Sequence, residues 1–292
     1  MSAPVVSTRN LGKTLGGKTI LRDISVEVEA GSVVGIIGKN GAGKSTLMDV
    51  LLGFSPATAG NAQVFGHDSF TLPAAAKGRI GFVAQQDELV NTLTGRQHLD
   101  LMAALLGRWN RALISRLQSD WQVPMGQPAQ QLSGGERQKL STLLALGHEP
   151  DLLVLDEPVA ALDPVSRRQF LRQLLEIADD SRRTVLFSTH IVSDLERVAD
   201  RIWIMRDGTL AWAGALDDLK ESVVRLHISA RRTLPPSLPL PGVVSLRATG
   251  QRAAAVVSQW NAGSLPGLRE ALDADIDVEP LGLEDLFVEL HS

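Results

Sequence analysis

Short runs of apolar residues recur along the first two thirds of the chain, and each predicts a buried β-strand. A run without polar alternation is typical of a strand that is covered on both faces, as in a parallel sheet. Between Gln85 and Gly147 the apolar residues instead follow helical spacing. This mixture of buried strands and helices predicts an α/β fold. The four strand runs are Val33–Ile37, Leu152–Leu155, Thr184–Ser188 and Ile202–Met205.

The end of the chain has a different pattern, which predicts a second, smaller domain. After about Lys220, apolar and polar residues alternate from Val224 to Ile228, as on a strand with one exposed face. A proline-rich break follows at residues 234–242, and short strands and helices then lead to an amphipathic helix at Leu283–Leu290. We therefore expect one domain over residues 1–220 and a small α+β accessory domain over residues 221–292.

The composition excludes several classes of protein. With 292 residues, 44% hydrophobic and 21% charged, the chain has the make-up of an ordinary globular protein. A net charge of −4 gives no electrostatic reason to expect a nucleic-acid partner. The chain has no cysteine, which excludes disulfides and thiolate metal sites. No stretch approaches the roughly 20 apolar residues that span a bilayer, so we expect any membrane role to depend on a partner.

A glycine-rich loop joins the first buried strand to a predicted helix at Leu47–Leu52. Glycines let backbone N–H groups approach phosphates, and the helix that follows directs its positive end toward them. In this pattern Lys44 reaches the β- and γ-phosphates, and the Ser45 hydroxyl ligates Mg²⁺. An ordinary glycine turn is the alternative, but the strand before the loop and the helix after it favour nucleotide binding. The loop reads Gly38, Lys39, Asn40, Gly41, Ala42, Gly43, Lys44, Ser45 and Thr46.

Two acids, Asp156 and Glu157, end the second buried strand, and Pro158 follows them. One carboxylate at such a place can hold Mg²⁺ through water, while its neighbour accepts a proton from an attacking water. Two solvated acids at a strand end would look the same. The phosphate loop earlier in the chain favours the catalytic interpretation.

A second candidate anion site stands at Ser133, Gly134, Gly135 and Glu136, just before a helix that runs to about Leu146. A serine and two glycines at a helix N-terminus can bind an anion, although alone they indicate no more than a helix cap. Because the phosphate loop already holds the γ-phosphate of the local nucleotide, this site would serve the nucleotide of a second subunit.

In this order, the motifs resemble those of the ATP-binding subunits of ABC transporters, over about residues 5–217. The resemblance implies a P-loop NTPase core with an antiparallel β subdomain and a helical subdomain at about residues 86–147. It also implies ATP and Mg²⁺ as cofactors and ATP hydrolysis as the activity.

The resemblance assigns roles residue by residue. Gln85 matches the glutamine that touches Mg²⁺ and signals to the membrane subunit, with Gln86 as an adjacent rival. Asp163 matches the D-loop aspartate and is equally well explained as a helix N-cap. His190 matches the switch histidine, which contacts the γ-phosphate. Lys44, Ser45 and Thr46 match the Walker A loop, Ser133 to Glu136 the signature, Asp156 the Walker B aspartate and Glu157 the catalytic glutamate.

One position departs from the family. Its members usually stack adenine on an aromatic residue near the N-terminus, where this chain has Leu15 and contains no tyrosine at all. A stacked base contributes roughly 1–3 kcal/mol. The substitution therefore predicts weaker discrimination between ATP and GTP.

Further similarities indicate a subgroup within this family. The ending Leu283–Leu290 and the stretch Ser188–Glu196 resemble ATPases of ABC-2-type export systems. The segment Leu106–Asn110 resembles the antibiotic-resistance, bacteriocin-immunity and related efflux subgroup. This implies a polytopic membrane permease, a second ATP-binding subunit, and a location at the cytoplasmic face of the membrane, bound through the permease. The intact motifs permit a homodimer and leave a paralogous partner open.

Within the helical region, the apolar residues Leu89, Val90 and Leu93 would form either a dock for the permease or helical core. An importer subunit, a non-transport ABC ATPase and a P-loop kinase remain the alternative functions. A kinase would not need the Ser133–Glu136 element.

Overall fold

The computed structural model describes residues 3–181, 183–235, 237–240 and 242–290. Pro236 and Pro241 of the proline-rich break, and residues 291–292 of the accessory domain, lie outside this description. The chain divides into two compact units, one up to Ala213 and one from Gly214 onward. This division falls inside a strand, β10, and each unit is described below by itself.

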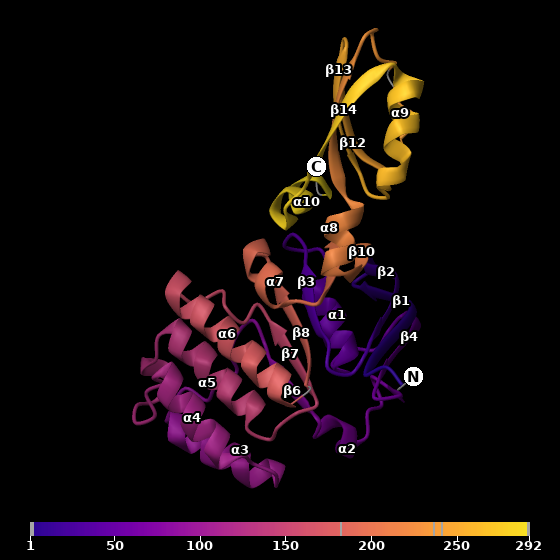
Figure 1. The fold of residues 1–292 in the computed structure, drawn as a ribbon. Coiled ribbons are helices and arrows are strands. Elements are labelled where there is room, and N and C mark those ends of the chain that lie inside the picture. The colour runs from indigo at the N-terminus through magenta and orange to yellow at the C-terminus, as the bar shows by residue number, and fades with distance from the viewer. Residues whose placement is uncertain (1–2, 182, 236, 241, 291–292) are drawn as a thin grey trace. The chain divides into compact units, whose positions relative to one another are not determined.

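A six-stranded sheet forms the centre of the first unit (Figure 1). Its strand order is β10-β9-β3-β8-β7-β6, and the strands from β9 to β6 pair in parallel. All residues of β3, β7 and β8 are buried, as their apolar runs predicted. The bounds are β3 Val33–Ile37, β6 Ile80–Val83, β7 Leu152–Asp156, β8 Thr184–Thr189, β9 Arg201–Arg206 and β10 Thr209–Ala215.

A second, antiparallel sheet has the order β2-β1-β4-β5. Helix α1 follows β3 in the chain. It shares one hydrophobic core with both sheets, and this core includes Leu11, Leu47 and Trp203. The elements are β1 Val6–Leu15, β2 Lys18–Val28, α1 Lys44–Leu51, β4 Ala59–Val64, β5 His67–Asp68 and the short α2 Ala74–Lys77.

The helices that follow β6 include the predicted helical region. Helix α5 packs against the edge strand β6, and both α3 and α4 pack against α5 (Figure 1). Two further helices, α6 and α7, pack against each other and follow β7 and β8 in the chain. Their bounds are α3 Gly95–Leu106, α4 Arg111–Trp121, the 3-10 helix η1 Ala129–Gln131, α5 Gly134–Leu146, α6 Pro164–Ser181 and α7 Val192–Val198.

The second unit is an antiparallel sheet of order β12-β13-β11-β14 with helix α9 against it. Its own core contains Leu226, Ile228, Val257, Leu268 and Ile276. The elements are α8 Leu216–Ser222, β11 Val224–Ala230, β12 Val243–Thr249, β13 Arg252–Val257, η2 Ala262–Ser264, α9 Leu265–Leu272, β14 Ala274–Pro280 and α10 Leu283–Leu290.

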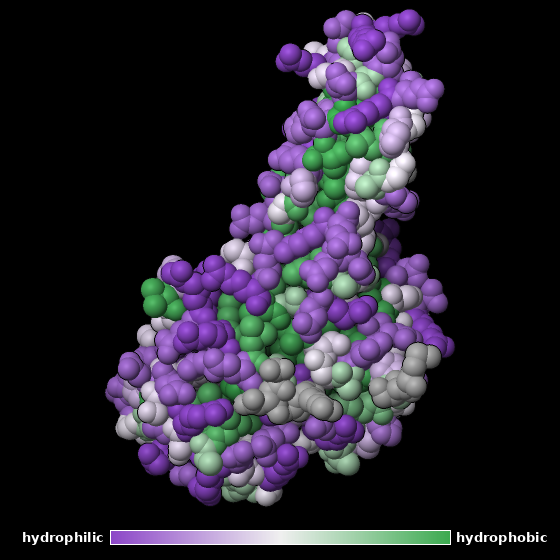
Figure 2. Space-filling view, in the orientation of Figure 1, coloured by the Kyte–Doolittle hydropathy of each residue, from purple (hydrophilic) through white to green (hydrophobic). Residues whose placement is uncertain are grey.

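On the face drawn in Figure 2, polar side chains cover most of the surface and apolar side chains form separate groups between them. Large apolar side chains that remain exposed include Phe54, Leu105 and Val165. None of the helices in the described ranges combines the length and apolar character that a bilayer crossing requires.

Candidate active site

The glycine-rich loop leaves the buried strand β3 and enters α1, as predicted. Gly41 and Gly43 have φ values of 82° and 101°, which side chains with a Cβ rarely adopt. A Cβ on Gly38 would lie 2.6 Å from the carbonyl oxygen of Met205, so that position has no room for a side chain. The loop conformation therefore requires glycine at these three positions.

The loop lines a cavity of about 360 Å³. Gln85 enters this cavity from the connection after β6, and Glu157 from the end of β7. Gln86, the alternative candidate to Gln85, does not line this cavity. The structure thus brings together three of the predicted elements from distant parts of the sequence. The lining residues are Lys18, Ile20, Asn40, Gly41, Gly43, Lys44, Ser45, Thr46, Gln85 and Glu157.

The buried Glu157 carboxylate lies between two nitrogen groups. Lys44 Nζ is 3.7 Å from Glu157 Oε1 and donates a hydrogen bond to the Gly38 carbonyl at 2.8 Å. His190 Nδ1 is 2.8 Å from Glu157 Oε2. Glu157 also has a φ of 51°, a left-handed conformation that is uncommon outside glycine and concentrates at functional sites. The carboxylate is therefore held in one orientation at the mouth of the phosphate loop.

Ser188 orders both acids at the end of β7, a role that the sequence did not reveal. Its hydroxyl donates to Asp156 Oδ1 and accepts a hydrogen bond of 2.9 Å from the backbone N–H of Glu157. Ser188 is completely buried, and it pairs with Asp156 in the parallel register of β7 and β8. A serine at the end of the run Thr184–Ser188 was the available signal, but its partners depend on the strand order.

Ser133 and Glu136 form a capping box at the start of α5. The Ser133 N–H and hydroxyl donate to Glu136 Oε2 at 2.7 and 2.8 Å, and the Glu136 N–H lies 3.3 Å from Ser133 Oγ. A Cβ on Gly135 would lie 3.1 Å from Leu162 Cδ2, so this helix start packs against the residues just before Asp163. None of Ser133–Glu136 lines the phosphate-loop cavity.

Asp163 caps a helix as its local sequence suggested, whereas Leu15, predicted to contact the nucleotide, lies outside the phosphate-loop cavity. Asp163 Oδ1 accepts hydrogen bonds from the N–H groups of Val165 and Ser166, which makes it the N-cap of α6. Hydrogen bonds from Ser166, and then from the Val165 backbone, lower the pKa of the Asp163 carboxyl. Leu15 ends β1, is 48% exposed and does not line the cavity. The cavity instead receives Lys18 and Ile20 from β2, which sequence reasoning missed.

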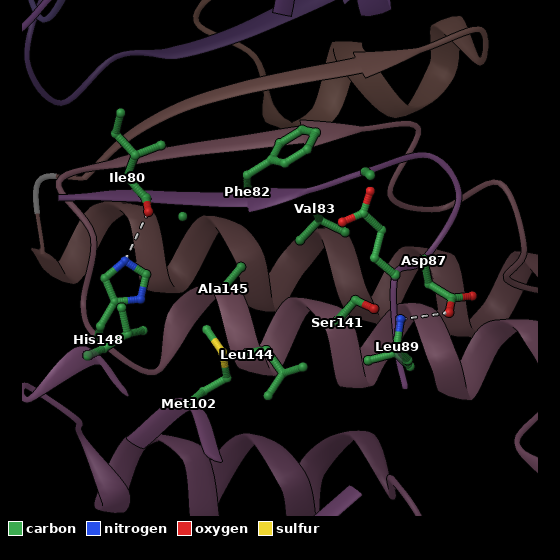
Figure 3. A pocket seen from close by; sticks show the side chains of 14 residues that line it. Ile80, Phe82, Val83, Asp87, Leu89, Met102, Ser141, Leu144, Ala145 and His148 are labelled. Carbon is green, nitrogen blue, oxygen red and sulfur yellow. Dashed lines mark hydrogen bonds between the residues drawn. The ribbon is translucent and has the colours of Figure 1, made fainter. Parts of the chain in front are cut away.

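A second cavity, of about 330 Å³, lies beside β6 and between α3 and α5 (Figure 3). Helix α5 and the residues after it contribute Ser141, Leu144, Ala145 and His148, which follow one another at helical spacing. Figure 3 shows Met102 and Phe82 on other walls of this cavity. The remaining lining residues are Ile80, Gly81, Val83, Ala84, Asp87, Glu88, Leu89 and Leu106. We call this cavity the α3–α5 groove.

Polar groups lie at both ends of the α3–α5 groove. Arg137 donates two hydrogen bonds to Asp87, one of them 2.8 Å from Nε to Oδ2, and the guanidinium lowers the pKa of the Asp87 carboxyl. His148 Nε2 is 3.0 Å from the Ile80 carbonyl, and burial lowers the pKa of the imidazole. Within the described residues, His148 Nδ1 and Ser141 Oγ are buried and have no hydrogen-bond partner.

The three apolar residues considered as dock or helical core precede α3 and are not part of a helix. Of the three, Leu89 lines the groove, while Val90 is 50% exposed. The helical-core interpretation is therefore wrong for this segment, because the chain is irregular from Ala84 to Thr94.

Comparison with known proteins identifies the family of this chain. Residues 21–160 match the ABC transporter family. The hypophosphite import ATP-binding protein HtxD of Stutzerimonas stutzeri is 35% identical, over 73% of this chain and 68% of its own. The Nod factor export ATP-binding protein I of Sinorhizobium fredii (strain NBRC 101917 / NGR234) is 33% identical, over 70% of this chain and 60% of its own. A solved ATP-binding subunit of an ABC transporter superposes with a TM-score of 0.68 at 27% identity, over 74% of this chain and 92% of that chain.

The fold and the cavity define a P-loop ATPase. More narrowly, the chain belongs to the family of ABC transporter ATP-binding proteins. The predictions of the family, the α/β fold and the ATPase class are thereby confirmed.

The two adjacent glutamines provide a matched test of the cavity. Because Gln85 lines it and Gln86 does not, Gln85→Ala should lower the kcat of ATP hydrolysis by about 10- to 100-fold, the usual effect of removing a group that orders a metal site, which is the role that the resemblance implies for Gln85. Gln86→Ala should stay close to the wild type. A phosphate-release assay on the two purified variants measures kcat for each. An equal loss of kcat in both would contradict the assignment of Gln85 to the cavity.

Proposed function

We propose that two copies of the ATP-binding unit close around two ATP molecules and so power export through a separate membrane permease. The main support is that each chain carries two different halves of a nucleotide site. One half is the phosphate-loop cavity with Gln85 and Glu157, and the other is the capped start of α5 at Ser133–Glu136.

In this proposal, the two halves of one chain bind different nucleotides. A helix N-terminus with free backbone N–H groups attracts an anion, and the start of α5 does not reach the phosphate-loop cavity of its own chain. We propose that it meets the γ-phosphate held by the other copy. Ser133, which donates its hydroxyl to Glu136 here, would then donate to that phosphate. Since all motifs are intact, a homodimer satisfies both sites, and a paralogous partner would do so equally.

The residues at the cavity suit Mg²⁺ as well as ATP. Ser45 and Gln85 offer oxygen ligands at the cavity, and Asp156 is held next to it by Ser188. Oxygen donors are what Mg²⁺ prefers, and this ion usually keeps waters and phosphate oxygens as further ligands. Where the structure describes the chain, no group of three or more acidic or histidine side chains forms a complete cage, and a site of this kind needs none. Bound Mg²⁺ would neutralise charge on the phosphates.

The chemistry proposed for this chain lies at Glu157. Its carboxylate accepts a proton from the water that attacks the γ-phosphate, while Lys44 binds the β- and γ-phosphates. His190, whose Nδ1 is 2.8 Å from Glu157 Oε2, would keep the carboxylate in place and contact the γ-phosphate. Positioning and charge neutralisation then supply most of the catalysis.

Replacing the proton acceptor tests this assignment. Glu157→Gln keeps the size of the side chain and removes its basicity, so kcat should fall by about 10²–10⁴ while ATP still binds. Glu176→Gln, a matched change at an exposed carboxylate of α6, should leave kcat unchanged. Hydrolysis of ATP by Glu157→Gln at near the wild-type rate would contradict the role of Glu157.

We propose that the α3–α5 groove receives a helix of the permease. One short connection links it to the nucleotide cavity, because Gln85 lines the cavity while Ala84, Asp87, Glu88 and Leu89 line the groove. Its walls are mainly apolar, and the carboxylate of Glu88 is exposed at its edge. His148 Nδ1 is left as a hydrogen-bond acceptor if Nε2–H donates to Ile80. A helix with an apolar face and a basic or donating side chain fits these features.

Two adjacent leucines of α3 test this dock. Leu106 lines the groove, whereas Leu105 is 70% exposed and lies outside it. Leu106→Glu should therefore abolish co-purification with the permease, while Leu105→Glu should retain it. Circular dichroism and the urea midpoint of both variants control for folding. If both variants co-purify equally well, the permease binds elsewhere.

The direction of transport and the location remain part of the proposal. Similarity of the chain ending to export ATPases favours export and a place at the cytoplasmic face of the membrane, bound through the permease. One relative is named for import and another for export, so family membership alone does not decide the direction. Relaxed discrimination between ATP and GTP, argued from Leu15, is a further part of the proposal. Competition between the two nucleotides for the purified chain measures it.

A further inference from the structure

The helices that follow the D-loop and the switch histidine are joined by a buried ion pair. Helix α6 begins directly after Asp163, and α7 begins two residues after His190. Arg167 Nε of α6 lies 3.8 Å from Asp194 Oδ2 of α7. The two side chains are 22% and 8% exposed, so water screens this pair only weakly.

Neither atom of the contact has another partner. In the part of the chain that the structure describes, Arg167 Nε and Asp194 Oδ2 are both buried and make no hydrogen bond. Burial raises the pKa of the Asp194 carboxyl, while the charges of Arg167, Arg197 and His190 lower it. A buried ion pair of this kind contributes little net stability compared with apolar side chains, and its use is to define a geometry.

The same guanidinium also contacts the D-loop. Arg167 Nη2 donates to the carbonyl of Leu162, the residue before Asp163, at 3.4 Å. Leu162 in turn packs near Gly135 at the start of α5. On the other side, Asp194 lies in the first turn of α7, four residues after His190, which contacts Glu157. Contacts therefore lead from the α5 start through Leu162 and Arg167 to Asp194, and the helix of Asp194 begins two residues after His190.

We propose that Arg167 and Asp194 are a positioning pair that couples the D-loop to His190 of the same chain. This inference rests on the proposed function, in which the start of α5 binds the nucleotide of the other copy. When that start engages the other nucleotide, Leu162 shifts with it, and the pair carries the shift to His190. Binding of ATP at one site thereby changes the position of His190 at the other site.

An apolar replacement separates this role from a structural one. Arg167→Met combined with Asp194→Leu removes both charges together, which is often neutral or stabilising for folding. The proposal expects the double variant to unfold at or above the wild-type urea midpoint, yet to hydrolyse ATP with a kcat lower by up to about 100-fold. The KM for ATP should change by less than about threefold, because Lys44 and the loop still bind the phosphates.

Two further variants complete the test. Arg167→Lys keeps the charge but not the planar fork that reaches both Leu162 and Asp194, so it should lose kcat as well. Arg168→Gln, at a neighbouring arginine whose Nε donates to the Pro164 carbonyl of its own helix, should behave as the wild type. Wild-type kcat in the double variant overturns the positioning pair. That result leaves the proposed function intact, which fails separately if Glu157→Gln still turns ATP over.

Discussion

The active site depends on the parallel register of β3, β7 and β8. In this register Ile37 pairs with Thr189, and Asp156 pairs with Ser188. The next residue along each strand is Gly38, His190 or Glu157, so the phosphate loop and these two side chains meet at one edge of the sheet. A shift of one residue would exchange the two faces of each strand, and Ser188 would then no longer lie beside Asp156.

In the proposed function, that edge supplies one half of a nucleotide site. The proposed other half is the capped start of α5, which belongs to the helical region and does not line the cavity of its own chain. Helix α5 also forms a wall of the α3–α5 groove. In this proposal one helix takes part in a second nucleotide site at its beginning and in the permease dock farther along. Binding of nucleotide by another copy and docking of the permease would act on the same rigid element.

The sequence predicts local features well. The four buried strands, the glycines of the phosphate loop and the N-cap at Asp163 each follow from a few adjacent residues. Contacts between distant segments could not be predicted in the same way. Ser188 meets Asp156, and Arg167 meets Asp194, only because of the order in which strands and helices pack. Lys18 and Ile20 reach the cavity for a similar reason, through the pairing of β1 and β2.

The central claim is that the start of α5 in one copy meets the nucleotide held by another. Because the chain has no cysteine, single cysteines can be introduced without competition, at Asn40 in one preparation and at Ser133 in another. The two preparations are mixed and treated with a short thiol-specific cross-linker, with and without ATP and Mg²⁺. The account predicts a cross-linked dimer of Asn40→Cys with Ser133→Cys that forms when ATP is present. A cross-link that does not exceed the level without ATP would contradict the account.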